Sequence, residues 1–141
     1  MRPVRYAPAV AAVALVAAGT GSGASPSERV VLKPVAGSHL SASAVVGAAG
    51  SGTRVAFTVS GTRRNAQLRA ILNAGTCKTR SASFATAGGK RADGRGRAAW
   101  TTRLRFHGSD VDWSTVSDGS HVLVLIVDGK AVACGAIPGM S

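Results

Sequence analysis

Few residues of this 141-residue chain are candidates for catalysis, metal binding or crosslinking, and its two cysteines are the most informative of them. Cys77 follows an apolar run in the middle of the chain, and Cys134 lies near the C-terminus. The chain begins with a pattern typical of export, and an isolated cysteine pair in an exported chain is most simply a disulfide. We therefore predict a Cys77–Cys134 bond, which leaves no thiolate to act as a nucleophile or a metal ligand.

Catalytic and metal-binding patterns are otherwise missing from the sequence. His39, His107 and His121 lie on separate segments without ligand spacing. We predict that they face solvent in loops, and that the protein has no metal and no cofactor. No nucleophile-elbow motif is present, so no catalytic residue is predicted. The segment Gly88-Gly89-Lys90 lacks the spacing of a phosphate-binding loop and is interpreted as a hairpin loop.

Basic residues are the remaining candidates for function, since 17 lysines and arginines stand against 6 acidic residues. Such an excess favours acidic partners, held with an affinity that falls as salt rises. The alternative is an ordinary solvated face in an arginine-rich chain. Base-specific nucleic-acid binding is not expected, because aromatic residues are scarce and Trp100 and Phe106 are predicted to be buried. The candidate polyanion-binding residues are Arg54, Arg69, Lys90, Arg91, Arg95, Arg97, Arg103 and Arg105.

Residues 1–24 have the layout of a secretory signal peptide that is removed on export. A basic start is followed by an apolar run from Ala7 to Ala18 and then by small residues. The run is shorter than the roughly 20 apolar residues of a membrane-spanning helix. The alternative is a buried N-terminal helix. We predict cleavage after Ala18 or Ala24, and secretion of a single domain over residues 25–141 with no membrane span.

The mature chain has the pattern of an all-β domain. Residues 53–60 alternate polar and apolar side chains, as in a half-buried strand, and residues 121–127 are continuously apolar, as in a strand covered on both faces. A short helical turn is predicted near Trp113. The spacing of the strands predicts one Greek-key β-sandwich or barrel. The eight predicted strands cover residues 28–35, 39–49, 53–60, 67–73, 81–87, 97–106, 121–127 and 131–136.

The surroundings of the two cysteines resemble the copper/zinc superoxide dismutase-like fold, and most closely its secreted CHRD-type relatives. The resemblance is carried by Ile71-Leu72-Asn73-Ala74-Gly75-Thr76-Cys77 and by Val132-Ala133-Cys134-Gly135-Ala136-Ile137-Pro138. In that family, a strand with a His-x-His pair runs into a glycine-containing turn and a cysteine. That cysteine pairs with one in an Ala-Cys-Gly segment of the last strand. The resemblance implies the family's β-sandwich and the same disulfide here.

The same comparison implies that the family's metal ligands are missing. Ile71 and Asn73 occupy the two histidine positions, and isoleucine has no donor atom while an asparagine amide is a poor copper ligand. The segment after Cys77 has no histidine-rich loop. No histidine stands near Ile126 or Val127, where the late copper ligand of the family would fall.

Three functions are compatible with these patterns. The first is a secreted, non-catalytic binding or structural module with a basic face for an anionic extracellular or cell-envelope partner. The second is a divergent dismutase-like metal protein with a rearranged site. The third is an assembly module that binds another extracellular protein, in which an exposed Trp113 would serve as an anchor.

Overall fold

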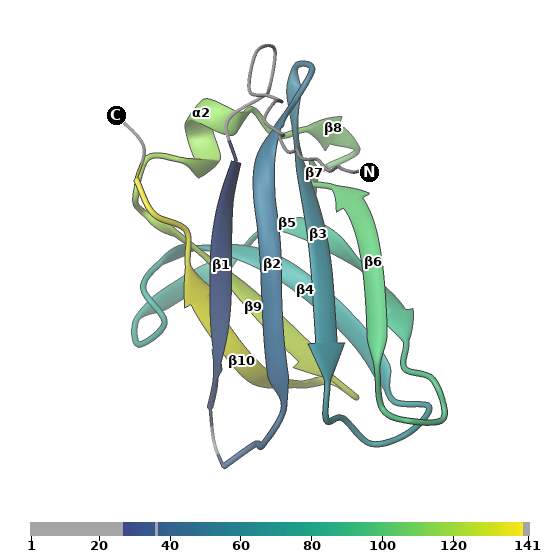
Figure 1. Cartoon of the computed structure of the whole chain (residues 1–141). Helices are drawn as coiled ribbons and strands as arrows, with labels where there is room; N and C mark the ends of the chain where they lie inside the picture. The colour runs from purple at the N-terminus through teal and green to yellow at the C-terminus, as the bar shows by residue number, and fades with distance from the viewer. Residues whose placement is uncertain (1–26, 36, 140–141) are drawn as a thin grey trace, which may run out of the picture.

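The computed structural model describes residues 27–35 and 37–139, and most of them lie in strands (Figure 1). This confirms the predicted all-β fold. The predicted signal peptide and its cleavage points lie outside these residues. None of the described residues forms a helix long and apolar enough to cross a membrane. The elements are β1 (Ser27–Pro34), β2 (Ser41–Ala49), β3 (Gly52–Ser60), β4 (Gln67–Gly75), β5 (Arg80–Arg91), β6 (Ala98–Arg103), β7 (Arg105–Phe106), β8 (Ser109–Asp110), α2 (Trp113–Val116), β9 (His121–Val127) and β10 (Lys130–Ala136).

The strands form one antiparallel sheet that folds over into a sandwich and nearly closes into a barrel. Their order is β6-β3-β2-β1-β10-β9-β4-β5-β7-β8. In Figure 1, β1, β2, β3 and β6 form the front layer, and β10, β9, β4 and β5 cross behind it. The pairing of β1 with β10 joins the layers on one side. On the other side, Trp100 Nε1 of β6 donates to the Ala87 carbonyl of β5 at 3.1 Å, so a side chain bridges the seam there.

The core lies between the two layers and follows the period of two that strands impose on their side chains. On β3, Val55, Phe57 and Val59 are buried while Arg54 and Thr58 are exposed. Phe57 stacks on the Trp100 ring of β6, with 4.7 Å between the ring centroids. The alternating pattern of residues 53–60 therefore predicted both the strand and its buried face.

Strand β9 is covered on both faces, as its unbroken apolar sequence predicted. Its inward residues Leu123 and Leu125 join the main core. Its outward residues Val122 and Val124 pack in a second apolar cluster with Cys134 and the partly buried Cys77.

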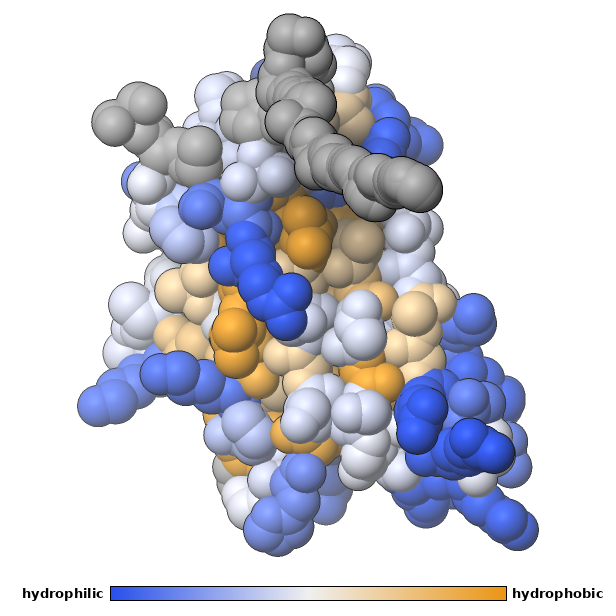
Figure 2. All heavy atoms as spheres, viewed as in Figure 1, coloured by the Kyte–Doolittle hydropathy of each residue, from blue (hydrophilic) through white to orange (hydrophobic). Residues whose placement is uncertain are grey.

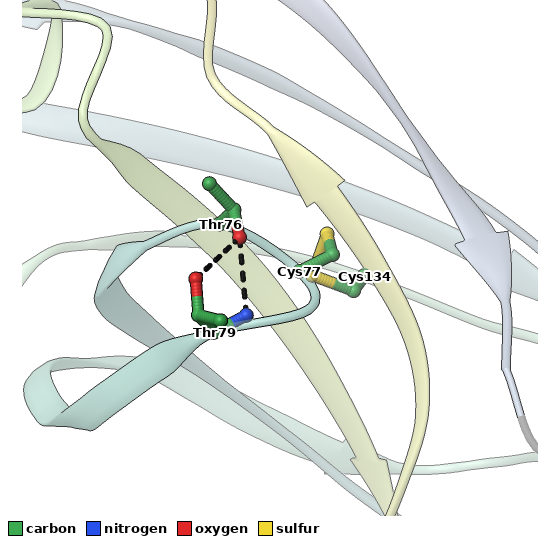
Figure 3. Close-up of a disulfide and its surroundings, with 4 residues drawn as sticks. All are labelled: Thr76, Cys77, Thr79 and Cys134. Atoms are coloured by element: carbon green, nitrogen blue, oxygen red, sulfur yellow. Dashed lines mark hydrogen bonds between the residues drawn. A yellow bond between two sulfur atoms is a disulfide. The ribbon is translucent and has the colours of Figure 1, made fainter.

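The predicted Cys77–Cys134 disulfide is present and joins the segment after β4 to β10, with 5.9 Å between the Cα atoms. The segment that carries Cys77 is a tight turn (Figure 3). Within it, the Thr79 amide donates to Thr76 Oγ1 at 3.0 Å, and the two threonine hydroxyls lie 2.9 Å apart. The disulfide thus fastens a short turn against the outer apolar cluster.

The interpretation of Gly88-Gly89-Lys90 as a hairpin loop was wrong, because β5 continues through these residues to Arg91. The register of β5 against β4 shifts just before Gly89, and Gly88 has a φ of 67°. A Cβ at Gly89 would overlap the carbonyl oxygen of Leu68 on β4. Gly88 therefore permits a bulge at positive φ, and Gly89 permits a close contact with β4 because it has no side chain.

The strand predicted over residues 97–106 is divided at the buried Leu104 into β6 and β7. Strand β7 then forms a small hairpin with β8. Phe106 is 42% exposed, so its predicted burial was wrong, and it stacks on Phe84 at 5.1 Å instead. The helical turn near Trp113 is confirmed as α2. Trp113 itself is partly buried against the core, which does not favour its role as an interface anchor.

Candidate polyanion-binding site

The structure separates the eight predicted basic side chains into distinct groups. Lys90 and Arg91 end β5, and Arg95 and Arg97 follow in the loop that leads to β6. The other four lie elsewhere on the strands: Arg54 on β3, Arg69 on β4, Arg103 at the end of β6 and Arg105 on β7. The four residues at the end of β5 and after it are therefore the nucleus of a local site.

The 92–97 loop lies against the 61–66 loop that connects β3 to β4. The Thr62 amide donates to the Gly96 carbonyl at 3.2 Å, and the Asn65 amide donates to the Asp93 carbonyl at 3.2 Å. These backbone bonds bring Arg63 and the neighbouring arginine of the first loop to the same end of the sandwich as the second. We call these two loops, together with the last two residues of β5, the basic loop pair; its cations are Arg63, Arg64, Lys90, Arg91, Arg95 and Arg97.

Gly96 is the residue that permits this close approach. It has a φ of 74°, in the left-handed region that glycine adopts without steric cost. A Cβ at this position would overlap the backbone carbonyl of Thr62. The contact between the loops therefore depends on the absence of a side chain at Gly96.

Two carboxylates lie at the basic loop pair, and both are engaged. Asp93 Oδ1 accepts the amides of Arg95 and Arg97 at 2.8 and 3.0 Å. Asp128 accepts from Arg63 at 2.6 Å and from the Gln67 amide at 3.1 Å.

These bonds lower the pKa of both carboxyl groups below their ordinary value of 3.8. The largest contribution comes from the Arg97 amide at Asp93 and from the Arg63 side chain at Asp128. Among the described residues, the guanidinium groups of Arg64, Arg95 and Arg97 form no ion pair. Their positive charge is therefore presented to solvent and to any anionic ligand.

The pKa of Asp93 is lower in the folded loop than in the unfolded chain. The ionised carboxylate therefore stabilises the loop fully at a pH above its ordinary pKa of 3.8. That stabilisation should be lost as the pH falls through the lowered, folded pKa. We expect the amide resonances of Arg95 and Arg97 to titrate together in this acidic range in an NMR pH series. Asp93→Asn is the control, whose two amides should not titrate there. Amides that stay constant while the Asp93 carboxyl resonance titrates would contradict the hydrogen bonds.

A shallow hollow of about 350 Å³ opens beside the basic loop pair. Its lining includes Thr58 and Ser60 of β3, Ala98 and Ala99 of β6, the cations Lys90, Arg91 and Arg97, and the carboxylate of Asp93. Lys90 Nζ donates to the Ala99 carbonyl at 3.2 Å, which positions its charge at the seam between β5 and β6. Cations around an open hollow are suited to hold sulfate, phosphate or carboxylate groups by charge-assisted hydrogen bonds.

The remaining predicted basic residues lie apart from this site. Arg54 and Arg103 are direct partners in the pairing of β3 with β6. Arg103 and Arg105 both approach the carboxylate of Asp110, at 3.5 and 3.4 Å, so part of their charge is offset. Arg69 is exposed on β4, in the other layer.

The positions matched to the lost family ligands, Ile71 and Asn73, lie on the outer side of β4, away from the main core. With Cys77, Ile126 and other residues they line a separate hollow of about 430 Å³. Asn73 is only 4% exposed. Within residues 27–35 and 37–139, no group of three or more histidine, cysteine, aspartate or glutamate side chains is arranged to hold a metal ion.

The three histidines are separate, but they do not all face solvent. His39 and His107 are exposed, whereas His121 is 7% exposed, so the prediction for His121 was wrong. Its ring lies 5.3 Å from the Phe84 ring, and its Nδ1 lies 3.1 Å from Asp118 Oδ1. Hydrogen bonds from Ser120, and then from His121, lower the pKa of Asp118. The position at the start of β9 directs this ring toward the sandwich interior.

Arg63 and Arg64 were missed by the sequence analysis. Their signal was a pair of arginines in a polar loop, which is also typical of ordinary solvated turns. Only the contact with the 92–97 loop distinguishes them.

No protein-family model, curated protein or solved structure matches this chain.

Proposed function

We propose that this protein is a secreted, non-catalytic β-sandwich that binds an anionic extracellular or cell-envelope polymer through the basic loop pair. The observation that carries the proposal is the hydrogen-bonded contact between the 61–66 and 92–97 loops. It gathers cations from two distant parts of the sequence, while the nearby carboxylates of Asp93 and Asp128 are engaged within the fold. A rigid basic surface loses less conformational entropy on binding than flexible cations do.

We also propose a superoxide dismutase-like scaffold. Its support is the connection between two strands: Cys77 follows β4 by two residues and is bonded to Cys134 on the last strand, β10. This is the connection that the resemblance implied. With isoleucine and asparagine at the matched ligand positions, binding of a polymer is better supported than metal chemistry.

The proposal predicts that Arg95→Ser combined with Arg97→Ser weakens binding to heparin, used as a sulfated probe, about tenfold. Each exposed charge contact contributes up to about 1 kcal/mol, and a loss of about 1.4 kcal/mol corresponds to a factor of ten in affinity. Titration calorimetry at low and moderate salt measures the effect. Affinity of the wild-type protein should fall as salt rises.

The matched control is Arg69→Ser combined with Lys78→Ser, which removes the same charge from elsewhere on the protein. This variant should bind heparin within about twofold of wild type, a difference of about 0.4 kcal/mol. Equal losses in the two variants would show that binding follows net charge alone. Absence of wild-type binding even at low salt would overturn the proposed function.

A further inference from the structure

The front layer of the sandwich has an outer face that no other described element covers. Alternate residues of β1, β2 and β3 point away from the core, and among them Val31 and Val45 are 59% and 45% exposed. Figure 2 views this face: pale and orange surface extends across it, a blue side chain lies over its middle, and further blue groups gather at the lower right, over the loops. The face is therefore a broad surface of small polar and apolar side chains that also carries the exposed cations Arg29, Lys33 and Arg54, with further basic residues at the loops.

A second hollow on this face, of about 440 Å³, continues the first one across the sheet. Both hollows include Thr58 and Ser60 in their lining. From these two residues the second hollow extends over β2 to β1, where Arg29 and Lys33 line it. A continuous shallow path thus runs from the basic loop pair to the cations of β1. We call it the sheet path.

The side chains along the sheet path indicate the kind of ligand that fits. Ser41, Ser43, Thr58 and Ser60 supply hydroxyl groups, each able to donate and accept a hydrogen bond. Val31 adds an apolar surface, and the lining of the second hollow includes no acidic residue. Anionic groups match the cations at the two ends, and sugar hydroxyls and C–H groups match the residues between them.

Resting on the proposed function, we propose that the ligand is an acidic polysaccharide that lies along the sheet path, from the basic loop pair to Arg29 and Lys33. Charge complementarity at both ends and the hydroxyl-rich middle favour this ligand. A single-stranded nucleic acid would instead need aromatic side chains on which its bases stack, and the lining of the sheet path contains none.

The width of the sheet sets a minimum length for the ligand. Neighbouring strands are about 4.8 Å apart, so the path from β6 across β3 and β2 to β1 spans about 14 Å. A short oligosaccharide reaches the basic loop pair alone, whereas a longer one also reaches the cations of β1. Affinity should therefore rise with oligosaccharide length and level off once both ends are occupied.

Size-fractionated heparin oligosaccharides test this inference, with Arg29→Ser combined with Lys33→Ser as the variant. The variant should bind the shortest fragment with the affinity of wild type. Its affinity for the long fragments should fall about tenfold, because two charge contacts are lost. The control is again Arg69→Ser with Lys78→Ser. A variant that matches this control on long fragments would overturn the sheet path while leaving the proposed function intact. If no fragment binds wild type, the proposed function fails as well.

A second measurement tests the recognition of sugar rather than charge alone. Thr58→Val removes a hydroxyl from an exposed position with little change in shape. It should weaken binding of long heparin fragments about threefold, a difference of about 0.7 kcal/mol, and leave binding of linear polyphosphate unchanged. Equal effects on the two polymers, or equal affinity of wild type for both at matched charge, would overturn the assignment to a polysaccharide.

Discussion

Replacing Cys77 and Cys134 with alanine is expected to lower the free energy of unfolding by about 4 kcal/mol. The two residues are 57 positions apart, so the disulfide restricts a long loop of the unfolded chain. In the folded state it also fastens the turn of Thr76–Thr79 against the cluster of Val122 and Val124. Against a usual net stability of about 5–15 kcal/mol, this loss is large.

Thermal unfolding measures this effect. For a domain of this size, a loss of about 4 kcal/mol corresponds to a fall in Tm of roughly 15–25 °C. Reduction of the wild-type protein should give a similar fall, and the alanine variant should be insensitive to reductant. If the Tm of the alanine variant lay within a few degrees of the wild-type value, the disulfide would have no stabilising role, in the folded or in the unfolded state.

Gly96→Ala is expected to lower the free energy of unfolding by about 3 kcal/mol and to weaken heparin binding at the same time. A left-handed alanine alone costs about 1–2 kcal/mol, and its Cβ would also have to displace the Thr62 backbone. The loops would then separate, so the arginines of one would lose their position beside those of the other. Chemical denaturation and heparin titration on the folded variant measure the two effects.

Gly94→Ala is the matched control, in the same loop. A Cβ at Gly94 has no neighbouring atom within 4 Å, so the substitution should change both stability and affinity little. If Gly96→Ala destabilises the protein but binds heparin like Gly94→Ala, then the arrangement of the loops does not determine affinity. If both variants resemble wild type, the close contact with Thr62 does not constrain the loops.

The parts of the fold that sequence analysis predicted well are those set by local patterns. Residues 53–60 and 121–127 show the side-chain period and the apolar run that a sheet imposes, and both became strands with the expected buried residues. Gly88 was misinterpreted because a hairpin and a bulge both use a glycine at positive φ. The sequence around Gly88 does not reveal that β4 continues to pair alongside it.

The candidate site was predicted only in part, for a similar reason. Lys90, Arg91, Arg95 and Arg97 are close in sequence, so their proximity could be foreseen. Arg63 joins them only because β3 and β4 lie in different layers and the loop between them meets the 92–97 loop. Such a contact depends on the packing of the layers, which has no signature in the residues of either loop.

The pairing of β1 with β10 also determines how the domain would be presented on a support. Strand β1 starts at Ser27 and β10 ends at Ala136. In Figure 1 both points lie away from the basic loop pair, β1 starting at the top of the sandwich and β10 ending on its left side. A surface, a label or a fused protein attached after β10 would therefore leave the basic loop pair facing outward. A C-terminal tag is the suitable point of immobilisation for measuring the capture of polymers by this protein.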